Sequence, residues 1–244
     1  MTGRGARARL ARLKLLVVNA DDLGYDPEID RGILEAHARG IVTSATVMVL
    51  SPFARAALGA APPTLGVGLH AVVPADLSRA AAEAELRAQL GRFEDLRGAA
   101  PTHLDSHKHA HAAPAILAAF TAVAAERGLP VRAIDAPMRA ALRAGGVVTA
   151  DRFLGDAARR PAWTEEALVT ALLGLEEGAT ELMAHPGYAP SHARTSFGHE
   201  RELELAALCS PRARAAADAA GAVLCDYAEF LSQRPHTRVA GRLP

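Results

Sequence analysis

The sequence predicts an α/β fold, a distorted (β/α) barrel, complete or incomplete, with about seven parallel strands. Short apolar runs alternate with longer segments rich in Ala, Leu, Glu and Arg along the whole chain, which is the pattern of βαβ units. The apolar runs lack alternating polar residues, so we expect both faces of each strand to be covered. Seven such runs favour a barrel over an open doubly wound sheet, although the pattern is compatible with both.

Each expected strand is one of these apolar runs, and the expected helices fill the intervals between them. Gly40, Gly128 and Gly221 stand where helices should end, because glycine readily adopts the left-handed conformation found there. The least regular stretch, Ala136–Arg160, is expected to form an insertion or a flexible loop. The predicted strands are Leu15–Asn19, Ala45–Leu50, Leu65–Leu69, Thr102–Asp105, Val131–Asp135, Glu181–Ala184 and Val223–Cys225. The predicted helices are Glu28–Arg39, Pro52–Ala60, Ala80–Leu96, Pro114–Arg127, Thr164–Leu175, Glu200–Cys209 and Arg212–Ala220.

The composition indicates one globular domain without a disulfide framework. A basic N-terminal arm over residues 1–10 is expected to precede a single domain over residues 11–244. Lys plus Arg equals Asp plus Glu at 27 each, so no net charge attracts nucleic acid. No apolar run approaches the roughly 18 residues that span a bilayer, and the apolar stretch after the arm is too short for a signal peptide. With only two cysteines, these features predict a cytoplasmic protein.

Polar side chains that can bind a metal ion follow four of the predicted strands. Asp21 and Asp22 come after the first strand, His70 ends the third, and His185 follows the sixth. The segment THLDSHKHAH at the fourth strand holds three more, namely His107, His109 and His111. Taken singly, the aspartates suit a helix cap, a lone histidine suits the core, and HKHAH suits a solvated loop. The carboxyl ends of parallel strands converge on one face, however, so the joint pattern favours a shared site.

The residue types in these clusters predict metal-assisted hydrolysis of an acyl bond, most simply an amide or an ester. Two histidines and one aspartate can bind a divalent ion and leave positions open for water and substrate. Such an ion lowers the pKa of bound water toward about 7. A second carboxylate can then accept the proton of that water, and another histidine can protonate the leaving group. The chain has no GxGxxG, GxxxxGK[ST], GxSxG or HExxH motif, which argues against nucleotide and serine-hydrolase chemistry.

Four ordered blocks of the chain resemble the YdjC-like carbohydrate deacetylases. The blocks are VVNADDLGYDPEIDRGILEAHARGIVTSATVMV, the GLH that ends at His70, PTHLDSHKHAH, and ELMAHPGY followed by RELEL. They extend from about Leu15 to Cys209, which is nearly the whole chain. The resemblance implies a distorted (β/α) barrel and metal-dependent removal of acetyl groups from amino sugars such as N-acetylglucosamine units.

The same resemblance implies roles for individual residues. Asp22, His70 and His107 would bind one divalent ion, either the Mg²⁺ usual for the family or the Zn²⁺ that this ligand set also suits. Asp21 would be the general base and His185 the general acid. The residues expected to contact the substrate are His109, His111 and Arg201.

Two departures from the family pattern concern the substrate rather than the chemistry. The sequence after GLH is shorter than usual, so the cleft beside His70 is expected to be shallow. Its missing contacts would come from Ala136–Arg160 or from a neighbouring subunit in a homodimer. Leu23 stands where the family more often has Phe. A lipid-linked or secondary-metabolite amino sugar, such as those near hopanoid pathways, therefore fits as well as a chitobiose-type substrate.

Three other readings of the sequence remain at this point. The segment LLVVNADD resembles the acidic pocket of a signalling receiver domain, but the second strand ends in MVLSP and leaves the histidines unexplained. A non-catalytic relative that binds sugar or metal is a second alternative. A metal-dependent hydrolase of another amide or ester is the third.

Overall fold

The chain folds around one parallel sheet of seven strands. The computed structural model describes residues 13–155 and 161–233, so the predicted N-terminal arm over residues 1–10 lies outside the described residues. The strands are β1 (Lys14–Leu23), β2 (Ser44–Val47), β3 (Gly66–Ala71), β4 (Leu104–Ser106), β5 (Arg152–Leu154), β6 (Gly178–Ala184) and β7 (Ala222–Leu224). The helices are α2 (Pro27–Arg39), α3 (Ala54–Ala60), α4 (Arg79–Arg97), the 3₁₀ helix η1 (His107–Ala112), α5 (Pro114–Arg127), α6 (Ala136–Ala144), α7 (Glu165–Leu173), α8 (His199–Leu208), α9 (Pro211–Ala219) and α10 (Tyr227–Gln233).

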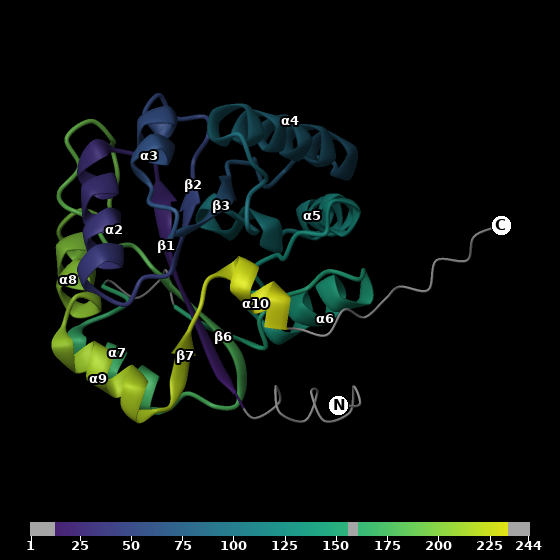
Figure 1. Ribbon diagram of the computed structural model, residues 1–244. Helices are drawn as coiled ribbons and strands as arrows, with labels where there is room; N and C mark the ends of the chain where they lie inside the picture. Colours follow the sequence, from purple (N-terminus) through teal and green to yellow (C-terminus); the bar gives the residue numbers. More distant parts are fainter. Residues whose placement is uncertain (1–12, 156–160, 234–244) are drawn as a thin grey trace.

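Strand β1 is the centre of the sheet, and it pairs with three others. The strand order is β4-β3-β2-β1-β6-β5, with β7 also paired to β1. Strand β6 pairs with β1 from Lys14 to Ala20, whereas β7 takes only the first three of these residues and β2 begins at Asn19. Since β7 and β2 pair with successive parts of one strand, the sheet curls into a half-barrel (Figure 1). The predicted distorted, incomplete barrel is confirmed.

Both faces of β1 are buried, as its uninterrupted apolar run predicts. Leu16 and Val18 face the large hydrophobic core, which the helices on the outside of the sheet cover. Leu15 and Val17 point the other way, into a smaller cluster that includes Tyr227. Helix α10 therefore covers the face of the sheet opposite to the main core.

The region from Val131 to Arg160 differs from the sequence prediction. Val131–Asp135 is not a strand, because only Val131 forms a bridge, to Leu104 of β4. The Asp135 side chain instead accepts a hydrogen bond from the Met138 backbone N–H at 2.7 Å and so begins helix α6. The stretch expected to be irregular thus holds α6 and β5, and only residues 156–160 within it are outside the described part.

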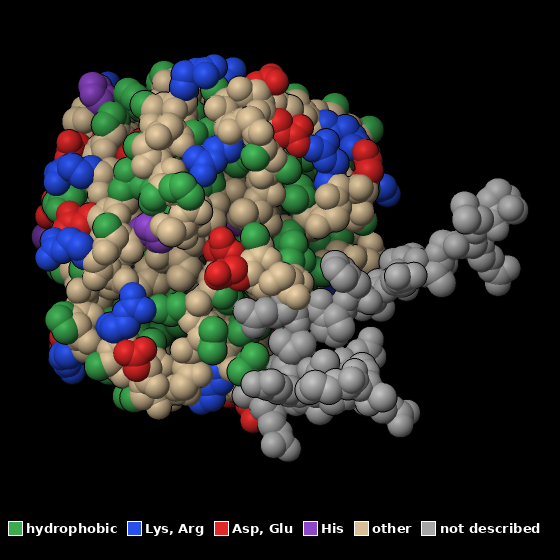
Figure 2. All heavy atoms as spheres, in the orientation of Figure 1, with side chains coloured by type: hydrophobic (Ala, Val, Ile, Leu, Met, Phe, Trp, Pro, Cys, Tyr) green, Lys and Arg blue, Asp and Glu red, His purple; other side chains and the backbone are tan. Residues whose placement is uncertain are grey.

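The outer surface carries both signs of charge. On the face shown in Figure 2, Lys and Arg side chains are interspersed with Asp and Glu. Within residues 13–155 and 161–233, no helix combines the length and the apolar character needed to cross a bilayer.

Helix α2 packs against the segment after β6 through Gly32, which provides a stability test. A Cβ at Gly32 would lie 2.5 Å from the Cα of Gly187, so the two backbones would have to separate. We expect Gly32→Ala to lower the free energy of unfolding by about 1–3 kcal/mol. At Gly91 in α4 a Cβ meets nothing within 4 Å, so Gly91→Ala should raise stability by about 0.5–1 kcal/mol. Urea denaturation of both variants measures this, and equal effects would contradict the packing.

Candidate active site

A break in the regular geometry of β1 brings two adjacent carboxylates to one place. Neighbouring side chains on a regular strand point to opposite faces. Asp22 instead has a φ of 73°, and the pairing of β1 with β2 shifts register between Ala20 and Leu23. This bulge lets Asp21 and Asp22 line the same cavity at the carboxyl end of the sheet.

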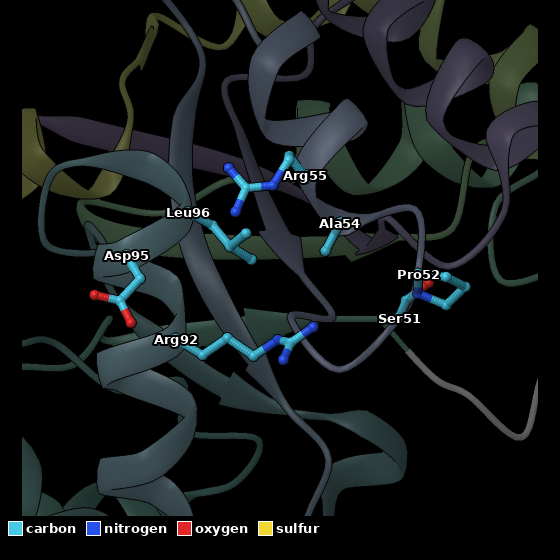
Figure 3. A pocket seen from close by; sticks show the side chains of 7 residues that line it. All are labelled: Ser51, Pro52, Ala54, Arg55, Arg92, Asp95 and Leu96. Atoms are coloured by element: carbon cyan, nitrogen blue, oxygen red, sulfur yellow. The ribbon is translucent and has the colours of Figure 1, made fainter.

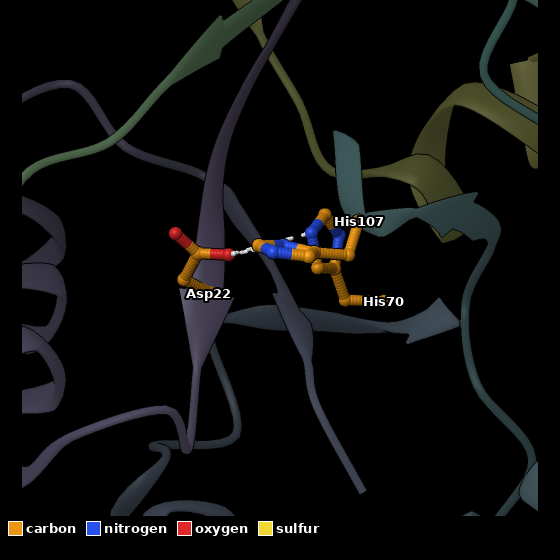
Figure 4. Close-up of side chains that lie close together, drawn as sticks. All are labelled: Asp22, His70 and His107. Carbon is orange, nitrogen blue, oxygen red and sulfur yellow. Dashed lines mark ion pairs between the residues drawn. The ribbon is translucent and has the colours of Figure 1, made fainter. Parts of the chain in front are cut away.

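Asp22, His70 and His107 come together as the sequence predicts (Figure 4). Asp22 Oδ1 lies 3.4 Å from His70 Nε2 and 3.3 Å from His107 Nδ1. One ligand atom from each residue lies within 4.8 Å of the others. The three side chains come from β1, β3 and the start of η1, so the convergence depends on the parallel sheet.

His70 is held in place by Asp105, a residue that the sequence analysis did not single out. His70 Nδ1 lies 2.7 Å from Asp105 Oδ1, which leaves Nε2 directed at Asp22. Burial alone would lower the pKa of His70, but the Asp105 carboxylate outweighs burial and the pKa rises to about 10. A carboxylate behind a metal-binding histidine orients the ring in this way in many metal sites. The HLDSH segment contains Asp105, but its strand position alone did not reveal this role.

The second oxygen of Asp22 is occupied by Arg201. Arg201 Nη2 donates to Asp22 Oδ2 at 2.6 Å, and Arg201 Nε donates to the Phe197 carbonyl at 2.9 Å. Burial favours a raised pKa for Asp22, but Arg201 and the two histidines lower it well below its usual value. Arg201 was expected to contact substrate. In the structure it lines the cavity, and its guanidinium binds the Asp22 carboxylate.

Asp21 is paired with Arg132, which the sequence analysis missed. Arg132 Nη1 and Nη2 each donate to an Asp21 oxygen at 2.7 Å. Burial raises the pKa of Asp21, but the guanidinium outweighs it and lowers the pKa, which keeps the carboxylate ionised. Asp21, His70 and Asp105 also lie close enough to form a second metal-binding group. Arg132 Nη1 also lies 2.8 Å from Asp105 Oδ2. The positive charge beside Asp21 and Asp105 is therefore already supplied by the Arg132 guanidinium.

The remaining predicted histidines have different surroundings. His185 Nε2 lies 4.0 Å from Asp21 Oδ2, and His185 lines the same cavity as Asp22, His70 and His107. His109 also lines the cavity, and burial lowers its pKa to about 4. His111 is fully buried behind the cavity, where its Nδ1 lies 2.5 Å from the Ser106 hydroxyl. His111 is not among the residues that line the cavity, and its expected contact with substrate stays a prediction.

The outer wall of the cavity is formed by Thr195, Ser196 and Phe197, between β6 and α8. The residues just before this wall are held by Asp26, whose Oδ2 accepts backbone hydrogen bonds from His192 and Ala193 at 2.6 and 2.8 Å. No described residue of the shortened loop after His70, or of the region 136–155, lines the cavity. Residues 195–197, which line the cavity, belong to a segment that the sequence analysis did not name.

Several polar atoms at the cavity make no hydrogen bond to the described residues. Among the described residues, seven buried side-chain nitrogen or oxygen atoms lack a hydrogen bond. Four of them belong to residues that line this cavity, namely Asp22 Oδ1, His109 Nδ1, His185 Nδ1 and Arg201 Nη1. Because an unpaired buried polar group costs about 1–3 kcal/mol, their concentration here indicates a place for polar ligands.

Comparison with known proteins decides the family. The profile of the YdjC-like protein family matches residues 15–76 and 72–219. The chain belongs to the YdjC-like family. Among its relatives, the carbohydrate deacetylase of Geobacillus stearothermophilus is 35% identical, covering 88% of this chain and 97% of the relative. The chitooligosaccharide deacetylase of Serratia marcescens is 32% identical, covering 89% of this chain and 99% of the relative.

A solved structure supports the same family fold. The Enterococcus faecalis protein, provisionally described as a cellobiose-phosphate cleavage protein, is 26% identical, with a TM-score of 0.80. The match covers 89% of this YdjC-like chain and 99% of that protein.

A second hollow lies between α3 and α4 and is not part of the YdjC-like site. Its lining includes Ser51, Arg55, Arg92 and Asp95 (Figure 3). Arg92 Nε donates to the Val49 carbonyl at 2.6 Å. The hollow shares no lining residue with the cavity and contains no histidine, so it offers none of the predicted chemistry.

The pKa of His70 predicts that a metal ion must displace a proton. In the absence of an ion His70 carries a proton at pH 7–9, because its pKa is about 10. Binding of Zn²⁺ should therefore release close to one proton and tighten about tenfold per pH unit over this range. Calorimetry in buffers of different ionisation enthalpy measures the release. Asp105→Asn removes the carboxylate that raises the pKa, so the variant should release less, and equal release from both proteins would contradict the assignment.

Proposed function

We propose that this YdjC-like chain is a metal-dependent deacetylase that hydrolyses the amide bond of an N-acetylated amino sugar. The observation that carries the proposal is the convergence of Asp21, Asp22, His70, His107 and His185 on one cavity. These side chains provide a ligand set, a candidate base and a candidate acid, which together are the requirements of metal-assisted amide hydrolysis.

The ligand set fits one divalent ion. Asp22 Oδ1 is buried and has no hydrogen bond, and His70 Nε2 and His107 Nδ1 both lie near it. Asp105 and Arg201 hold the ligand groups of His70 and Asp22 from behind. An ion bound there, whether Mg²⁺ or Zn²⁺, would supply Lewis-acid activation of water and of the acetyl carbonyl.

The protein side chains carry the proton transfers in this proposal. Asp21 is kept ionised by Arg132 and accepts a proton from the attacking water. At the same time the oxygen of the water bonds to the acetyl carbon. His185, whose Nε2 lies 4.0 Å from Asp21 Oδ2, donates a proton to the amide nitrogen as the carbon–nitrogen bond breaks. The products are acetate and the free amino sugar. A carboxylate and an imidazole facing the same bond thus divide the work of base and acid.

The cavity wall supports a sugar as the substrate. Phe197 offers an aromatic face beside His185, with ring centres 5.1 Å apart, and Thr195 and Ser196 lie on the same wall. Aromatic rings and hydroxyl groups together match the apolar faces and hydroxyls of a pyranose. The relatives from Geobacillus and Serratia are named as deacetylases of carbohydrates and chitooligosaccharides, which favours the same substrate class here.

The direct test is incubation of the protein, loaded in turn with Mg²⁺ and Zn²⁺, with N-acetylglucosamine, chitobiose and longer chitooligosaccharides. We expect equal amounts of acetate and free amine, and no product after treatment with a chelator. O-acetylated sugars and simple N-acetyl amides in the same assay separate a sugar deacetylase from a general esterase or amidase. Metal binding without release of acetate from any N-acetyl sugar would refute the proposal and favour a non-catalytic relative.

The two aspartates should respond differently to loss of charge. Asp21→Asn keeps the shape and most of the metal affinity but removes the base, so kcat should fall about 10²–10⁴-fold. Asp22→Asn should weaken metal binding, and excess ion should restore part of its activity. His185→Ala should keep the metal and slow release of the amine. Metal titrations with turnover test all three, and rescue of Asp21→Asn by added ion would show that the two roles are reversed.

A further inference from the structure

We infer that Glu181 and Tyr227 are positioning residues that hold Arg132, and through it Asp21, in the orientation needed for proton transfer. The inference rests on the proposed function, because it assigns Asp21 as the general base. Neither Glu181 nor Tyr227 lines the cavity, so neither touches the substrate. The effect of Glu181, and of the Tyr227 hydroxyl that binds it, would pass through the Arg132 guanidinium.

The Arg132 guanidinium is fixed on three sides. Its two Nη groups face Asp21, its Nη1 also lies 2.8 Å from Asp105, and its Nε donates to Glu181 Oε1 at 2.7 Å. The side chains of all four residues are between 0 and 3% exposed. A guanidinium is planar, so the hydrogen bond at Nε sets the direction in which both Nη groups point. Glu181 therefore sets the orientation of the Arg132 guanidinium relative to the Asp21 carboxylate.

Tyr227 fixes Glu181 in turn. The Tyr227 hydroxyl donates to Glu181 Oε2 at 2.5 Å, so each oxygen of the carboxylate has its own donor. The Tyr227 ring is stacked on His103, with ring centres 3.9 Å apart. His103 Nε2 lies 3.0 Å from Asn19 Oδ1, and Asn19 Nδ2 donates to Asp21 Oδ1 at 2.9 Å. The contacts thus form a closed ring that begins and ends at Asp21.

The cost of this arrangement argues for a role beyond stability. Buried ion pairs are often no more stabilising than apolar residues of the same size, because each charge loses its hydration. Here one guanidinium and three carboxylates are buried in the centre of the half-barrel, beside the apolar cluster that α10 covers. A hydrophobic contact would anchor α10 to the sheet equally well. The polar ring instead fixes the one carboxylate whose orientation determines the reaction.

Tyr227→Phe is the direct test, because it removes only the hydroxyl and keeps the ring on His103. We expect kcat to fall about tenfold, with KM and Zn²⁺ affinity unchanged. Tyr188→Phe is the matched control, since the half-buried Tyr188 hydroxyl donates to Glu35 Oε2 at 2.6 Å and neither residue lines the cavity. The control should leave kcat unchanged. Equal kcat in Tyr227→Phe and wild type would overturn the inference.

A second readout follows the guanidinium itself. In ¹⁵N NMR the Arg132 Nε–H signal, identified by its loss in Arg132→Lys, should exchange slowly in the wild type and faster in Tyr227→Phe. Glu181→Gln keeps an oxygen for Nε and should retain more activity than Glu181→Ala. A lower kcat with unchanged Nε–H exchange would show that Tyr227 does not act through Arg132 and would overturn the inference. A wild type that releases no acetate refutes the proposed function, whereas an active wild type with an unaffected Tyr227→Phe refutes only the positioning role.

Discussion

The contact between the Arg132 guanidinium and three buried carboxylates is the interaction on which the site depends. Without that cation, Asp21, Asp105 and Glu181 would place three negative charges in the interior with no counter-charge beyond His70, at a cost of several kcal/mol each. With it, Asp21 stays ionised and Asp105 is free to orient His70. The two halves of the site, the proposed base and the candidate metal-binding group, therefore share one electrostatic support.

The candidate metal-binding group is likewise held by buried side chains that do not themselves belong to it. His70 is turned by Asp105 and Asp22 by Arg201, so two of the three candidate ligands are held by buried partners. The left-handed backbone at Asp22 then brings its carboxylate to the same cavity as that of Asp21. A side chain with few accessible rotamers loses little entropy when it binds an ion. The buried partners thus restrict the motion of the His70 and Asp22 side chains before any ion binds.

The sequence predicted the framework well because the apolar runs of buried parallel strands are distinctive, and residues that follow such strands share one face. Asp22, His70 and His107 could be placed together for that reason. Arg132 could not be singled out, since it is one of many arginines in the sequence. Its role depends on carboxylates from three strands, which only the folded structure brings together. The helix after Asp135 was missed because the apolar run before it resembled a strand, although the Asp-Ala-Pro start is a helix signal. The wall around Phe197 has no periodicity to detect.

Asp26 links the start of helix α2 to the segment that leads to the outer wall of the cavity. Its carboxylate caps α2 and also holds the backbone of the segment that leads to the cavity wall. The hydrogen bonds go to backbone N–H groups, so they do not depend on which side chains the segment carries. Residues 195–197 can consequently change during evolution while the segment keeps its path and the buried site stays intact. New selectivity within this lineage would then arise by substitution at a few wall positions, with no change to the buried side chains of the proposed catalytic site.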